Sequence, residues 1–79
     1  MNKDHILDTI ILQIREVIPA LAQRPLDASD SLKALGANSV DRADIIMMTL
    51  ESLSVQIPLF EMAKAENIGD IASIIHARL

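Results

Sequence analysis

The feature that most limits the possible folds is the spacing of the apolar residues, which recur every three or four positions in three separate stretches. These stretches are residues 4–18, residues 39–53 and the segment from residue 67 onward. Such spacing places apolar side chains on one face of an α-helix. No segment alternates with the period of a strand, and SLSVQI is the only short β-favouring stretch. The sequence therefore predicts an all-α fold, a small bundle of three main helices and one short helix.

Residues typical of helix ends support these boundaries. Asn2 or Asp4 can cap the first helix, and Pro19 argues against its continuation. Pro58 suits the first turn of the short helix, residues 58–65, and Asn67 can cap the last helix. On a helical wheel, the predicted buried face of the second helix consists of Val40, Ala43, Ile46, Met47, Leu50 and Leu53. The apolar face of the last helix consists of Ile68, Ile71, Ile74 and Ile75.

The segment between the first two helices is predicted to be a long loop. Residues 19–38 contain two prolines, a cluster of Asp and Ser residues and one glycine. Connections of this length are uncommon in compact domains and are usually functional or attached to the core. Leu26, Leu32 and Leu35 are predicted to attach the loop, with one short helical turn near residues 31–35.

Length and composition indicate one domain with an aliphatic core. The 79 residues leave no room for a second core, so residues 1–79 are expected to form a single domain. Met1 and the compact ends favour a stand-alone protein. Phe60 is the only aromatic residue, and it is expected in the core together with Met47 and Met62.

Charge and residue usage exclude several classes of function. The net charge of −4 argues against a nucleic-acid surface, which needs clustered Lys and Arg. Cysteine is absent, so disulfides and thiolate ligands are excluded, and His5 and His76 alone do not suggest a metal site. No apolar run approaches the length of a membrane span, and the N-terminus lacks the apolar core of a signal peptide. A monomeric cytoplasmic protein is therefore expected.

Ser39 lies where the long loop meets the second helix, and three roles fit it. Asn38 or Ser39 can be the helix cap. A catalytic serine needs an oriented base, and nothing in the sequence places His5 or His76 beside Ser39. As a third role, Ser39 can carry a phosphate group, because the unpaired N–H groups and positive dipole at a helix start favour one. Such a serine would be a tether on which other enzymes act.

The stretch Leu35-Gly36 followed by Ser39, together with the length, acidity and helix pattern, resembles the acyl carrier proteins along essentially the whole chain. In that family the serine of an Asp-Ser-Leu motif receives 4′-phosphopantetheine from coenzyme A through a phosphopantetheinyl transferase. The thiol of this arm then holds acyl groups as thioesters. The resemblance implies that Ser39 is the attachment site of a non-catalytic carrier. Asn38 and Val40 replace the usual Asp and Leu of the motif.

The string GANSVDRADI, residues 36–45, resembles a narrower group, the discrete donor carriers of polyketide β-branching. In that group an acyltransferase loads malonate and a ketosynthase-like decarboxylase leaves acetyl on the carrier. An enzyme similar to HMG-CoA synthase then accepts the acetyl group. The resemblance implies this donor role. A general fatty-acid or modular polyketide or nonribosomal carrier, and a helical interaction module without a prosthetic group, remain alternatives.

The side of the second helix opposite its predicted buried face indicates a docking surface. Acidic residues there would attract a basic partner, while two apolar residues would supply buried contact. The residues predicted for partner binding are Asp41, Arg42, Asp44, Ile45, Met48 and Glu51. Alternatively, the long loop covers the two apolar residues. Arg42 can form an ion pair on the helix surface, bind the phosphate, or discriminate between partners.

Overall fold

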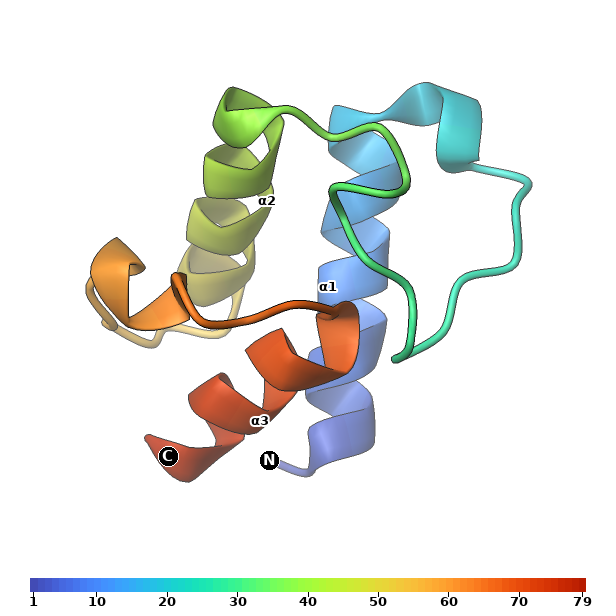
Figure 1. The fold of residues 1–79 in the computed structure, drawn as a ribbon. Coiled ribbons are helices and arrows are strands. Elements are labelled where there is room, and N and C mark those ends of the chain that lie inside the picture. The colour runs from blue at the N-terminus through green and yellow to red at the C-terminus, as the bar shows by residue number, and fades with distance from the viewer.

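The computed structural model describes residues 1–79 and contains three α-helices and no strands (Figure 1). The helices are α1 (Lys3–Val17), α2 (Ser39–Ser52) and α3 (Ile68–Ala77). Two short 3₁₀ helices, η1 (Pro19–Leu21) and η2 (Leu59–Met62), lie in the connections. This architecture confirms the predicted all-α bundle. The short helix predicted over residues 58–65 is limited to the 3₁₀ helix η2, which Pro58 precedes, and the sequence does not predict η1.

The helix boundaries follow the capping residues. Asn2 rather than Asp4 caps α1, because its side-chain oxygen accepts a hydrogen bond of 2.8 Å from the backbone N–H of His5. At α3, Asn67 accepts a bond of 2.7 Å from the N–H of Asp70. The helix α1 ends at Val17, and Pro19, which cannot donate a helical hydrogen bond, begins η1.

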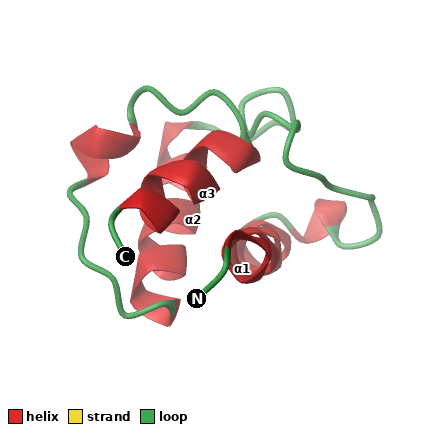
Figure 2. Cartoon of the chain, turned by 90° about the horizontal axis from the view of Figure 1, so that it is seen from below, coloured by secondary structure: helices red, strands yellow, loops and turns green.

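Helix α1 packs against both α2 and α3, while the backbones of α2 and α3 do not approach each other closely. The short helix η2 contacts both of them and bridges the gap. In Figure 2, α1 lies beside the α2–α3 pair, and the two termini lie near each other at one end of the molecule. The core is aliphatic, as predicted, and its completely buried apolar side chains are Ile6, Ile10, Ile14, Ile45, Ile68, Ala72 and Ile75.

Two of the three residues expected in the core lie outside it. Met62 is buried, but Phe60 is 77% exposed and Met47 is 46% exposed. A 3₁₀ helix has three residues per turn, so Phe60 lies on another side of η2 than the buried Met62. Met47 is exposed because the buried face of α2 differs from the face that the sequence predicts.

The long loop is attached to the core and to α3. Leu32 is buried, and Leu26 and Leu35 pack against the core, as predicted. The backbone N–H groups of Ile68 and Gly69 donate hydrogen bonds of 2.9 and 2.8 Å to the carbonyl oxygens of Asp30 and Ala28. These bonds satisfy donors that the first turn of α3 would otherwise leave unpaired.

A tight turn shapes the part of the loop that contacts α3. The Ser29 hydroxyl and backbone N–H both donate to the carboxylate of Asp27, and they hold the pKa of this exposed group below its ordinary value of 3.8. The Asp30 carboxylate in turn accepts a hydrogen bond of 2.8 Å from the Asp27 N–H.

The end of α2 contains a residue in the left-handed conformation. Ser54 has φ +56°, its N–H donates to the Glu51 carbonyl at 3.1 Å, and the Val55 N–H donates to the Leu50 carbonyl at 2.9 Å. This pair of bonds is the Schellman motif, in which glycine is the preferred residue at the position of Ser54. The Cβ of Ser54 therefore adds strain.

We expect Ser54→Gly to raise the free energy of unfolding by about 0.5–1 kcal/mol, because glycine adopts this conformation without a Cβ clash. Urea unfolding followed by circular dichroism measures the change. Ser52→Gly, inside the last turn of α2, is the matched control and is expected to lower stability instead. A destabilised Ser54→Gly protein would contradict this description of the helix end.

Candidate functional site

Ser39 is the first residue of α2, and the helix is capped by its neighbour Asn38. The Asn38 side-chain oxygen accepts a hydrogen bond of 2.8 Å from the Asp41 N–H, and the Asp41 carboxylate accepts one of 3.3 Å from the Asn38 N–H. This reciprocal capping box decides between the two candidate caps. It does not use the Ser39 hydroxyl, and Ser39 is exposed.

The turn before Asn38 fixes the direction from which the chain enters α2. Three backbone hydrogen bonds form the short turn predicted near residues 31–35. The N–H of Leu35 donates to the Ser31 carbonyl at 2.9 Å, that of Gly36 to the Lys33 carbonyl at 3.1 Å, and that of Ala37 to the Leu32 carbonyl at 3.0 Å. Gly36 closes this turn with φ +96°, a conformation that favours glycine. Leu32 and Ala37, on either side of it, are both buried.

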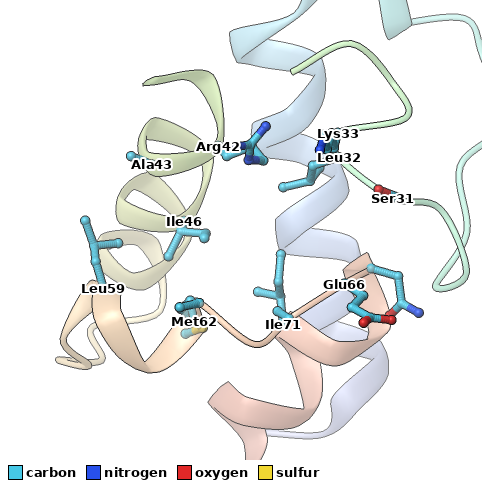
Figure 3. Close-up of a pocket in the computed structure, with 13 residues that line it drawn as sticks. Ser31, Leu32, Lys33, Arg42, Ala43, Ile46, Leu59, Met62, Glu66 and Ile71 are labelled. Atoms are coloured by element: carbon cyan, nitrogen blue, oxygen red, sulfur yellow. The ribbon is translucent and has the colours of Figure 1, made fainter. Parts of the chain in front are cut away.

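Arg42 connects α2 back to this turn. Its guanidinium donates a hydrogen bond of 2.7 Å to the Ala37 carbonyl, and the side chain is half-buried. In Figure 3 it extends from α2 toward Leu32 and Lys33 of the loop. Arg42 therefore binds a backbone carbonyl and forms no ion pair with an acid on the helix surface. The one ion pair of the structure joins Arg78 and Glu61.

The start of α2 favours an attached anion. The first backbone bond of the helix runs from the Arg42 N–H to the Asn38 carbonyl, so the preceding N–H groups of Ser39 and Val40 have no helical acceptor. These donors lie at the positive end of the helix dipole. The residues present thus fit a phosphodiester on the Ser39 hydroxyl.

Neither histidine lies near Ser39. His5 is in the first turn of α1 and His76 in the last turn of α3, and Figure 1 shows both of these ends opposite the start of α2. Ser39 therefore has no imidazole within reach as a base, and the arrangement suits a tether rather than a catalytic nucleophile.

None of the helices is long and apolar enough to cross a membrane.

The structure contradicts the predicted orientation of α2. The helical wheel predicts that Ile45 lies on the solvent side, but it is completely buried, and so is Thr49 one turn later. The Thr49 hydroxyl donates a hydrogen bond of 2.8 Å to the Ile45 carbonyl, which lets this polar residue lie in the core. The predicted buried face was drawn through apolar residues alone and therefore left out Thr49. As a result, it is rotated about the helix axis away from the observed buried face.

The true outer face of α2 combines apolar and acidic residues. Val40 and Met47, predicted to be buried, are 66% and 46% exposed, and Met48 is 37% exposed. Glu51 is exposed, and Asp41, Asp44 and Arg42 are half-buried. On the wheel, Val40, Asp44, Met47 and Glu51 share the side away from Ile45 and Thr49. The outer face is defined here as Val40, Asp41, Asp44, Met47, Met48 and Glu51.

A cleft of about 560 Å³ opens beside the outer face, between α2, η2, the long loop and the start of α3 (Figure 3). It lies where the backbones of α2 and α3 do not pack closely against each other. Ile46, Met62 and Ile71 give it an apolar floor. Lys33 and Arg42 lie at one side and Glu66 at another. Sequence spacing alone did not indicate this cleft, since its lining comes from four separate segments.

Comparison with known proteins identifies the family of this site. Residues 8–75 match the family described as the phosphopantetheine attachment site. The chain belongs to the phosphopantetheine-binding acyl carrier proteins. It is 42% identical over 79 residues to the polyketide biosynthesis acyl-carrier-protein AcpK of Bacillus subtilis (strain 168), across 100% of this chain and 96% of that protein. The prosthetic group of this carrier family is a covalently attached phosphopantetheine.

The chain is similar to two further proteins. It is 29% identical over 73 residues to hispidin synthase of Neonothopanus nambi, across 92% of this chain and 4% of that protein. Its fold matches a chain in the crystal structure of the curacin biosynthetic pathway HMG synthase in complex with acetyl donor-ACP. This match has a TM-score of 0.92 and 48% identity, and covers 98% of this chain and 99% of the other.

We expect Asn38→Ala and Ser39→Ala to differ in stability, because only Asn38 caps α2. Loss of the cap is expected to lower the free energy of unfolding by about 1 kcal/mol. Ser39→Ala is expected to remain within about 0.5 kcal/mol of the wild type. Urea unfolding of the three proteins in their unmodified form measures both effects. A larger loss for Ser39→Ala than for Asn38→Ala would contradict the assignment of the cap.

Proposed function

We propose that residues 1–79 form a single carrier domain that bears phosphopantetheine on Ser39 and catalyses no reaction itself. The supporting observation is the free hydroxyl of Ser39 at the start of α2, where Asn38 already performs the capping. When bound, the arm supplies a thiol that holds an acyl group as a thioester. The chain orients the arm through the turn at Gly36, and the free N–H groups of the first helical turn stabilise the charge of its phosphate.

We further propose that the carrier supplies acetyl groups for β-branching in polyketide biosynthesis. Two relatives support this role: AcpK is a polyketide carrier, and the 48% identical structural neighbour is an acetyl donor in complex with an HMG synthase. In this proposal a phosphopantetheinyl transferase modifies Ser39 and an acyltransferase loads malonate. A ketosynthase-like decarboxylase removes carbon dioxide to leave acetyl, and an HMG-CoA-synthase-like enzyme accepts it. The protein would act as a monomer in the cytoplasm.

The proposed docking surface is the outer face of α2. It keeps four of the residues predicted from sequence, Asp41, Asp44, Met48 and Glu51, and replaces Ile45 with Val40 and Met47. The acids can increase the rate of encounter with a basic partner, and the apolar side chains can supply buried contact area. Arg42 contributes indirectly in this proposal, by holding the loop that precedes Ser39.

The partial match to hispidin synthase supports a second candidate, a general carrier of a modular or fatty-acid synthase. Acetyl transfer separates the two candidates. The acetylated carrier and an acetylated fatty-acid carrier are each incubated with an HMG-CoA-synthase-like enzyme and an acetoacetylated acceptor carrier. Intact mass then reports the loss of acetyl from each donor.

We expect rapid loss of acetyl from this protein and at least about tenfold slower loss from the fatty-acid carrier, a discrimination of the size that a few interface contacts provide. Equal rates from the two carriers would favour the general carrier. A modified, acetylated protein that donates to neither acceptor nor enzyme would contradict the β-branching role.

A further inference from the structure

One side of the cleft beside α2 is basic, although the protein as a whole is acidic. The chain has 11 acidic residues against 7 Lys and Arg residues. The lining of the cleft has the opposite balance, with Lys33 from the long loop, Arg42 from α2 and a single acid, Glu66. Figure 3 shows the two cations at the same side of the cleft and Glu66 at another. This side of the cleft therefore attracts an anion.

Neither cation has an acidic partner within the protein, because the one ion pair joins Glu61 and Arg78. Lys33 is exposed, so its ammonium group is available to a ligand. Arg42 uses one guanidinium nitrogen, Nη1, to bind the Ala37 carbonyl. Since a guanidinium has five N–H donors, others remain for a second acceptor. Two such cations on separate segments can bind the same carboxylate through charge-assisted hydrogen bonds.

Helix α2 places this basic side close to the attachment serine. An α-helix rises 1.5 Å per residue, so along the helix axis Arg42 lies about 4.5 Å and Ile46 about 10.5 Å beyond Ser39. Both residues line the cleft. An arm on Ser39 therefore starts within one helical turn of Arg42, and its acyl end can fold back over the cleft.

The two acyl groups of the proposed donor function differ in charge. A malonyl thioester ends in a carboxylate. Decarboxylation releases carbon dioxide and puts a proton from water in its place, so the resulting acetyl thioester is neutral. The basic side of the cleft complements the malonyl group and has no charged group to bind on the acetyl group. Charge therefore distinguishes the two states of the cargo, although they differ little in size.

We propose that Lys33 and Arg42 bind the carboxylate of a malonyl group carried on Ser39, and that decarboxylation releases the arm from the cleft. This inference rests on the proposed donor function. It gives the carrier itself a part in the order of the reactions, because the malonyl form is held at the cleft while the acetyl form is free to enter the accepting enzyme. Ion pairs at an exposed site are weak, so the decarboxylase can still withdraw the malonyl group.

NMR of the carrier alone tests this proposal, without any partner enzyme. The wild type is prepared with malonyl, acetyl or acetoacetyl on its arm, since acetoacetyl has nearly the shape of malonyl but no charge. The backbone amide shifts of Ala43, Ile46 and Ile71 report what occupies the cleft. We expect the malonyl form to differ from the other two forms at these residues. The difference is expected to shrink as salt is added, because salt screens an exposed ion pair.

Lys33→Gln is expected to reduce the malonyl-specific shift difference by at least about half, because one of the two cations is lost. Lys33→Arg is expected to retain the difference. Lys64→Gln is the matched control, since Lys64 is also exposed but does not line the cleft, and it is expected to behave as the wild type. Thermal unfolding verifies that all variants are folded. An undiminished difference in Lys33→Gln, or an equal loss in Lys64→Gln, would overturn the proposal.

These outcomes are distinguishable from failure of the proposed function. If the wild type accepts the arm and donates acetyl, but its malonyl, acetyl and acetoacetyl forms give the same shifts, the donor function stands and the carboxylate site is wrong. If the malonyl-specific difference is present but no acetyl is donated, the carboxylate site stands and the donor function is wrong. If the folded wild type accepts no arm, both are wrong.

Discussion

The structure depends on the burial of one side of α1 between two helices whose backbones do not pack closely against each other. Ile6, Ile10 and Ile14 are completely inaccessible to solvent, and each contributes about 1.5–3 kcal/mol when it leaves water. Because α1 supplies the shared contact, α2 and α3 can diverge, and the gap between them is closed by η2 and the long loop. The cleft, the exposed outer face of α2 and the free start of α2 all follow from this arrangement.

The same arrangement explains why a long loop is compatible with so small a domain. Its leucines pack against the core, its carbonyls accept hydrogen bonds from the first turn of α3, and the Arg42 guanidinium binds the Ala37 carbonyl. The turn before Ser39 is therefore held both by its own backbone hydrogen bonds and by Arg42 of α2. A carrier requires this combination, because the attachment serine must be exposed while the surface around it keeps one shape for its partner enzymes.

Periodicity and capping residues were sufficient to predict the three helices, since each has a strong apolar face and an asparagine or an equivalent residue at its start. They were not sufficient to predict the rotation of α2. The buried Thr49 satisfies its hydroxyl within its own helix, and hydropathy gives no sign of this. The exposure of Phe60 and Met47 is not predictable for a related reason, because hydropathy alone does not distinguish an exposed apolar side chain from a buried one. At the site, the position of Ser39 could be predicted, but the choice of Asn38 as the cap and the contact of Arg42 required coordinates.

The central claim is that Ser39 is free to bear the arm because Asn38 caps the helix. Its most direct test is intact mass after incubation with coenzyme A and a broad-specificity phosphopantetheinyl transferase, with Ser39→Ala in parallel. We predict that the wild type gains one phosphopantetheine group and that the folded Ser39→Ala protein gains none. A folded wild type without the added mass, or a Ser39→Ala protein that still gains it, would contradict the account.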